Sequence, residues 1–201
     1  IITVTMRTPG DDASLAAGLL FTEGVVHSAG DIVAIEQSTD NQIWLTLVHG
    51  NGEKLARFKR EFISNSSCGV CGKMSVAALA LQVNTPWAAF APMDLKDLLA
   101  LPDQLRAAQT LFDETGSVHA AGLFDQTGRL LLIAEDVGRH NTVDKVIGRA
   151  LLEQVDMSQA LLVVSARAGF ELVQKAIVAR IPVMFAVGGP TSLAVDLARE
   201  Y

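Results

Sequence analysis

Near the carboxyl end of the chain, short apolar runs alternate with segments of helical spacing, and this alternation limits the fold more than any other feature. ALLVVS (160–165) and IPVMFAV (181–187) are continuous apolar runs of strand length. Each precedes a segment with helical apolar spacing, FELVQKAIVAR (170–180) or SLAVDLARE (192–200). Buried strands that alternate with helices are typical of a layered sheet that contains parallel strands. The sequence therefore predicts a layered α/β sheet in this part of the chain.

The segments just before this alternation add a hairpin and a helix. SVHAAGLFD and RLLLIAED flank the turn sequence QTG within residues 117–136, which predicts two antiparallel strands. An amphipathic helix is predicted over residues 141–154, with Asn141 or Thr142 available as its N-terminal cap. The layered part therefore begins with antiparallel pairing and continues with parallel strands.

Two further helical regions are predicted upstream. Residues 93–116 indicate two helices that are broken near Pro102, because proline disrupts the interior of a helix. The short run MSVAALALQ (74–82) indicates one more helix.

The first third of the chain has a different pattern. Residues 11–26 start with two acidic residues and show helical apolar spacing, and three strand-like runs follow between residues 31 and 62. We therefore predict a small α+β subdomain over residues 1–66, made of a helix and an antiparallel meander, followed by the α/β domain over residues 67–201. The chain opens within a strand-like run and stops within a helical one, so we expect the native protein to extend at both ends.

Composition narrows the classes of function. The 16 basic and 22 acidic residues give a net charge of −6, which argues against a general binder of nucleic acid or anionic membranes. We find no signal peptide and no apolar run of membrane-spanning length, and two cysteines do not make a disulfide framework. These features favour the cytoplasm.

Both cysteines of the chain lie in one polar, glycine-rich stretch, SSCGVCGKMS (66–75). A structural zinc site needs four ligands, and only one Cys-x-x-Cys pair is present, with no His-x-Glu element of the zinc-deaminase type. The stretch also lacks the setting of a thioredoxin-like motif, and it is too polar to be core filler. The remaining hypothesis is a nucleophilic, sulfur-carrying thiol, because Lys73 and a following helix would favour the thiolate.

A second group of candidate residues follows the predicted strands. EDVGRHNTVDKVIG (135–148) places Arg139 and His140 where a strand leads into a helix, and two similar turns follow the later strands. Because ligands gather beyond the carboxyl ends of parallel strands, we expect an anion to bind there. An alternative is that Asp136, Arg139 and Asp144 form a structural network. Neither a Walker loop nor a G-x-G-x-x-G series is present.

Taken in order, SSCGVCGK, HAAGLFD, EDVGRHNTVDKVIGRALLE, FELVQKA and PTSLAVDLA resemble the formate dehydrogenase accessory sulfur-carrier family, FdhD, as does the opening MRTPGDDASLAAGLLFTEGVV. The resemblance implies a cytidine-deaminase-like fold with a smaller N-terminal part, acting as a homodimer. It implies a carrier, rather than a conventional turnover enzyme, that takes persulfide sulfur from a cysteine desulfurase. The sulfur goes to the bis-(guanine dinucleotide) molybdenum cofactor of formate dehydrogenase. Cys68 would be the persulfide site and Cys71 its relay.

The residues that we expect to bind the cofactor are Arg139, His140, Asn141, Ser165, Arg167, Gly188, Gly189 and Thr191, and no permanently bound metal is expected. The chain departs from the family pattern at Ser165-Ala166-Arg167 and at Gly188-Gly189-Pro190, and it lacks the family's C-terminal Gly-Arg segment. Two alternative functions stay open at this point. One is a zinc-dependent, deaminase-like hydrolase, and the other is a cofactor or guanine-nucleotide chaperone whose thiols are incidental.

Overall fold

The computed structural model describes residues 3–48, 52 and 86–201. The helices in these ranges are α1 (Asp12–Thr22), α4 (Leu95–Ala107), α5 (Thr110–Thr115), α6 (Arg139–Leu152), α7 (Phe170–Val178) and α8 (Ser192–Glu200). The strands are β1 (Ile32–Thr39), β2 (Gln42–Leu47), β3 (His119–Asp125), β4 (Leu130–Asp136), β5 (Ala160–Arg167) and β6 (Val183–Gly188). Two short 3₁₀ turns lie at Ala29–Asp31 and Met157–Gln159.

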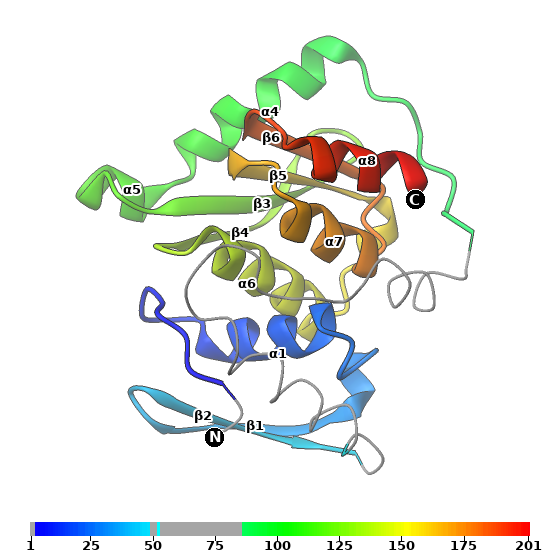
Figure 1. Ribbon diagram of the computed structural model, residues 1–201. Helices are drawn as coiled ribbons and strands as arrows, with labels where there is room; N and C mark the ends of the chain where they lie inside the picture. Colours follow the sequence, from blue (N-terminus) through cyan, green and yellow to red (C-terminus); the bar gives the residue numbers. More distant parts are fainter. Residues whose placement is uncertain (1–2, 49–51, 53–85) are drawn as a thin grey trace.

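These elements form a stack of layers (Figure 1). A four-stranded sheet lies between α4 on one face and α6 with α7 on the other, and α8 packs beside α7. Helix α1 packs on the outer side of α6, and the β1–β2 hairpin packs on α1. The predicted helix, hairpin and strand–helix alternation are thereby confirmed, and the chain is a mixed α/β protein.

The order of the four-stranded sheet is β4-β3-β5-β6. Strand β3 runs antiparallel to both β4 and β5, whereas β5 and β6 are parallel as predicted. Strands β4, β5 and β6 therefore all point in one direction, and their carboxyl ends meet at one edge of the sheet. His119, opposite Asp136 in the pairing register, starts β3 at this same edge.

Alternating side chains of the sheet build two cores. On one face, Ala121, Leu123, Leu162 and Val164 pack against α6 and α7. On the other face, Ala120, Phe124, Leu161 and Val163 pack against α4. Successive residues of a strand point to opposite faces, so these continuously apolar strands need a cover on both sides.

Helices α1 and α6 approach each other at glycines. A Cβ atom at Gly18 would lie 1.8 Å from the backbone oxygen of Asp144, and one at Gly148 would lie 1.9 Å from the backbone oxygen of Ser14. Only residues without a side chain allow this backbone-to-backbone contact. The first helix of the chain is therefore fixed directly on the main layer.

The break predicted near Pro102 is wrong, because α4 runs through this proline from Leu95 to Ala107. Leu101 and Leu105 are buried one turn apart on the same face of α4, and their packing on the sheet holds the helix together across the proline. The break falls instead at Gln109, whose backbone leaves the helical region before α5 begins.

The predicted cap of α6 is also wrong. Helix α6 begins at Arg139 with Gly138 as its N-terminal cap, and Asn141 and Thr142 both lie inside the helix. The strand-like run at 53–62, the helix at 74–82 and the boundary at residue 66 lie outside the described residues.

Candidate functional site

The three strand-to-helix turns that the sequence singles out lie at the same edge of the sheet. They follow β4, β5 and β6, whose carboxyl ends all face one way. Arg167 and Gly188 are partners in the parallel ladder, so the second and third turns are immediate neighbours. The topology therefore brings the candidate anion-binding turns together.

The first turn presents a cation and an imidazole at the start of α6. The Arg139 carbonyl accepts from the Thr142 hydroxyl at 2.7 Å, but its guanidinium makes no hydrogen bond or ion pair with any residue that the structure describes. His140 Nε2 lies 2.6 Å from Glu171 Oε2, which joins this turn to α7. Glycine is needed at position 138, because a Cβ atom there would lie only 2.9 Å from Asn141 Nδ2 and would crowd the start of the helix. The guanidinium of Arg139 is thus available to an anion.

His119 lies beside this turn at the start of β3. Partial burial lowers the pKa of His119 below its ordinary value, and the charges of Arg139 and His140 lower it further. The imidazole is therefore mainly neutral at pH 7 and can accept a hydrogen bond or a proton. Arg139 therefore supplies the permanent positive charge at this turn, since His119 is mainly neutral and His140 is paired with the Glu171 carboxylate.

Ser165 and Arg167, at the end of β5, have different roles. The Ser165 hydroxyl accepts a hydrogen bond from the Ala120 backbone N–H at 2.9 Å and so closes the ladder between β3 and β5. Arg167 is exposed, and in the described ranges its side chain has no hydrogen-bond or ion-pair partner. Of this pair, Arg167 presents a charged group at the edge that is unpaired among the described residues.

The third turn combines close packing with open backbone. A Cβ atom at Gly188 would lie 2.8 Å from the Arg167 side chain, whereas one at Gly189 would meet no atom within 4 Å. The Thr191 hydroxyl caps α8 by accepting from the Ala194 N–H at 3.3 Å, and the Thr191 N–H donates to Ala168 O at 3.0 Å. Gly189 therefore leaves the backbone of this turn accessible.

Asn141 does not reach the edge. It is buried, and its side-chain amide donates to Asp136 Oδ1 at 2.9 Å and to Met6 O at 2.8 Å. The alternative network of two aspartates and Arg139 is half right: Asp136 and Asp144 are both buried in polar networks, with Lys145 and Lys175 respectively, but Arg139 belongs to neither.

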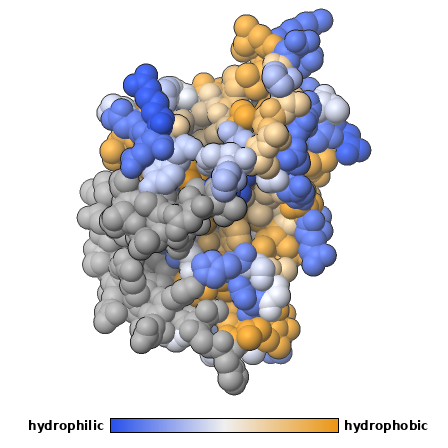
Figure 2. Space-filling model, turned by 90° about the vertical axis from the view of Figure 1, so that its right-hand side faces the viewer, coloured by the Kyte–Doolittle hydropathy of each residue, from blue (hydrophilic) through white to orange (hydrophobic). Residues whose placement is uncertain are grey.

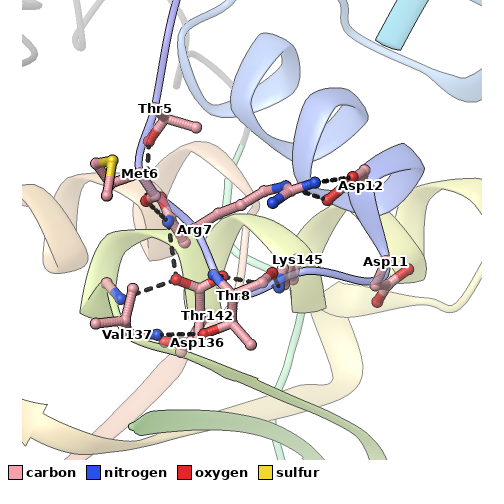
Figure 3. A network of polar contacts seen from close by, with 12 residues as sticks. Thr5, Met6, Arg7, Thr8, Asp11, Asp12, Asp136, Val137, Thr142 and Lys145 are labelled. Carbon is pink, nitrogen blue, oxygen red and sulfur yellow. Dashed lines mark hydrogen bonds and ion pairs between the residues drawn. The ribbon is translucent and has the colours of Figure 1, made fainter. Parts of the chain in front are cut away.

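Sequence analysis missed the residues that hold the first turn from the N-terminal side. Thr8 and Lys145 both contact Asp136 (Figure 3). Arg149 pairs with Asp11. Thr8 and Asp136 are 128 positions apart, so no local pattern in the sequence indicates their contact.

Two grooves reach this edge of the sheet. One, of about 550 Å³, is lined by mixed side chains that include His119, Ser165 and Val187. The other, of about 640 Å³, is mainly apolar and includes Ala168 and Gly188. Both volumes suit a ligand of nucleotide size or larger. Figure 2 shows that the side of the molecule turned toward the viewer exposes several hydrophobic residues between hydrophilic ones.

Cys68 and Cys71 lie outside the described residues. Within the ranges 3–48 and 86–201, no three His, Cys, Asp or Glu side chains gather in a way that could hold a metal ion. No helix in the described part of the chain has both the length and the apolar character needed to cross a membrane.

Comparison with known proteins agrees with the sequence motifs. The sequence profile of the FdhD/NarQ family matches residues 1–201. A sulfur carrier protein FdhD from Mycolicibacterium paratuberculosis is 46% identical over 99% of this chain and 77% of its own length. Another protein of that name, from Saccharolobus solfataricus, is 42% identical over 98% of this chain and 74% of its own.

A solved structure has the same fold. It is the crystal structure of a candidate formate dehydrogenase accessory protein from Desulfotalea psychrophila, which superposes with a TM-score of 0.73. The alignment covers 98% of this chain and 72% of that one at 23% sequence identity.

Proposed function

Because the chain belongs to the FdhD/NarQ family, we propose that it is a sulfur carrier that serves formate dehydrogenase. The protein accepts persulfide sulfur from a cysteine desulfurase and transfers it to the bis-(guanine dinucleotide) molybdenum cofactor. The observation that carries this proposal is that relatives aligned along nearly the whole chain are named sulfur carrier protein FdhD. The paired thiols support sulfur exchange, and the cationic sheet edge supports binding of an anionic cofactor.

Sulfur is accepted by exchange at Cys68. The Cys68 thiolate attacks the outer sulfur of the donor's cysteine persulfide, the donor's S–S bond breaks, and the donor cysteine leaves as a thiolate. Cys68 then carries the persulfide, and the step needs no outside oxidant or reductant. The positive charge of Lys73 favours the thiolate, and Cys71 supplies a second thiol for relay or release.

The sulfur acceptor is a large anion, and the sheet edge suits its pyrophosphate groups. Arg139 and Arg167 offer guanidinium groups, which bind phosphate through paired N–H donors. His140, whose Nε2 is held by Glu171, contributes its remaining ring nitrogen, Nδ1, and Gly189 lets a phosphate approach the backbone near Thr191 at the start of α8. These five residues are the proposed direct contacts.

The other three predicted binding residues support this edge from behind. Asn141 fixes the first turn, Ser165 closes the ladder between β3 and β5, and Gly188 allows β6 to approach Arg167. We propose that these three residues contribute to binding by holding the contacting residues in position.

Further parts of the proposal come from the family resemblance. They are a homodimeric assembly, a cytoplasmic location, formate dehydrogenase as the recipient, and a cytidine-deaminase-like origin of the layered domain over residues 67–201. The helices on both faces of the mixed sheet are consistent with such an origin.

The test is the intact mass of the protein after incubation with a cysteine desulfurase and cysteine. We expect a gain of whole sulfur atoms that a thiol reductant removes. Cys68→Ala should abolish the gain, and Cys71→Ala serves as the matched variant in the same loop. A zinc-sized increment in place of sulfur would contradict the proposal and favour the hydrolase. Activation of formate dehydrogenase by Cys68→Ala at the wild-type level would favour the chaperone.

A further inference from the structure

The N-terminal segment Met6–Asp12 lies across the turn that presents Arg139 and His140 (Figure 3). It approaches the junction of β4 and α6 from a part of the chain about 130 positions away and leads into the first residue of α1. This segment, residues 6–12, is here termed the strap. Its contacts here are polar: Thr8 uses both its backbone and its side chain, and Met6 O accepts from Asn141 Nδ2 at 2.8 Å.

Thr8 uses each of its polar groups on the turn or on α6. Its backbone N–H donates to Asp136 Oδ2 at 3.1 Å, and its hydroxyl accepts from the Val137 N–H at 2.9 Å. Its carbonyl accepts from Lys145 Nζ at 3.0 Å. Thr8 therefore bonds to the residues on either side of the strand end.

The Asp136 carboxylate is the centre of the network and is fully buried. Oδ1 accepts from the Gly138 N–H at 2.8 Å and from Asn141 Nδ2 at 2.9 Å. Oδ2 lies 2.7 Å from Lys145 Nζ and also accepts from Thr8. With four donors around it, this carboxylate is fully satisfied and fixes the turn rather than meeting a ligand.

The strap is anchored at both of its ends. Arg7 pairs with Asp12 at 2.7 Å and donates to Asp40 O at 2.7 Å, which ties the strap to α1 and to the β1–β2 turn. Near the carboxyl end of the strap, Asp11 pairs with Arg149 of α6. The contacts of Arg7 and Asp11 thus hold the strap in place without using Arg139 or His140.

We infer that Thr8 is a positioning residue of the cofactor site: through Val137 and Asp136 it sets the path of residues 137–140, and so the placement of Arg139 and His140. The inference rests on the proposed binding of the cofactor's pyrophosphate groups at this edge. Val137 N–H is the backbone group next to Gly138, where the chain turns into α6. If Val137 N–H loses its acceptor on Thr8, the backbone is no longer fixed at the point where β4 leads into α6.

The test uses three variants of the full chain and GDP as the probe, with affinity measured by titration calorimetry. Thr8→Val keeps the shape of the side chain but removes the acceptor for Val137. Thr8→Ser retains that acceptor. Thr5→Val makes the same chemical change in an exposed residue whose hydroxyl donates to Met6 O at 3.4 Å. Loss of one hydrogen bond predicts affinity weaker by about threefold to tenfold in Thr8→Val.

We expect Thr8→Ser and Thr5→Val to bind GDP as the wild-type protein does. A second readout is the amide NMR signals of Val137 and Gly138, which should shift in Thr8→Val and return in Thr8→Ser. Equal GDP affinity in the wild-type protein and Thr8→Val would overturn the inference and leave the proposed site standing. Failure of the wild-type protein to bind GDP would overturn the cofactor site and the inference with it.

Discussion

Replacement of Asp144 by asparagine tests the buried ion pair that joins α1, α6 and α7. Lys175 Nζ donates to Asp144 Oδ1 at 2.7 Å, to Asp144 Oδ2 at 2.9 Å and to Thr22 Oγ1 at 2.9 Å. Asp144 is 2% exposed and Lys175 is 7% exposed. Asparagine keeps the shape of the aspartate and removes its charge, so the lysine remains buried without its nearest counter-ion.

The size of the effect follows from this burial. Burial opposes the charged form of Lys175, but the charges of Asp144 and Glu23 outweigh it and raise the lysine pKa. Removal of one partner of a buried pair typically costs about 3–5 kcal/mol. We expect about 3 kcal/mol, the low end of that range, because an amide oxygen still accepts one bond and Glu23 Oε1 lies 4.0 Å from Lys175 Nζ.

The assay is urea unfolding at pH 7, followed by circular dichroism. The folded pKa of Lys175 lies above its ordinary value of 10.5, so the stability that the charged lysine contributes is fully present at pH 7 and is lost as pH rises through the folded pKa. Arg129→Ala, which removes an exposed pair with Asp125, is the control and should cost at most about 1 kcal/mol. A loss in Asp144→Asn no larger than in this control would refute the reasoning.

A double variant separates the charge from the packing. Asp144→Leu combined with Lys175→Met replaces the pair by apolar groups, and such replacements are often close to neutral. We therefore expect the double variant to be more stable than Asp144→Asn. Equal losses would mean that shape, not charge, accounts for the effect.

Three further changes have defined outcomes. Gly148→Ala puts a Cβ atom 1.9 Å from Ser14 O, so α1 and α6 must separate, and urea unfolding should show a loss of at least about 3 kcal/mol. Pro102→Ala restores a helical donor and should raise the unfolding free energy by about 1 kcal/mol or more; no gain would contradict the account of α4. The pKa of His119, measured by NMR, should lie below 6.5, because burial and the Arg139 charge oppose protonation of the imidazole. The free energy of unfolding should therefore fall as the pH is lowered below 6.5. Added GDP should raise the pKa of His119.

Local periodicity predicted most of the described elements because most strands and helices of the main layers have a clear apolar pattern. The strands ending at Asp136, Arg167 and Gly188 are examples, and their order allowed the common edge of the turns to be anticipated. The error at Pro102 has a physical cause. The cost of a proline within a helix was outweighed by the burial of Leu101 and Leu105, which no local rule includes.

The candidate site was only partly predictable for a similar reason. Arg139 and Arg167 stand out in the sequence as cations near strand ends, and the structure leaves both guanidinium groups without a partner among the described residues. Asn141 stands out equally in the sequence, yet its side-chain amide is buried and donates to Met6 O and Asp136 Oδ1. Its bond to Met6 and the bond from Thr8 to Asp136 each join residues more than 120 positions apart, beyond any local pattern.

The central claim is that Cys68 delivers sulfur to the molybdenum cofactor. The most direct measurement is a single-turnover transfer in which the protein, loaded with ³⁵S at Cys68, is mixed with formate dehydrogenase that contains the unsulfurated cofactor. The account predicts that label leaves the carrier, appears with formate dehydrogenase, and is accompanied by formate oxidation. Equal activation by unloaded protein, or retention of the label on the carrier while activity appears, would contradict it.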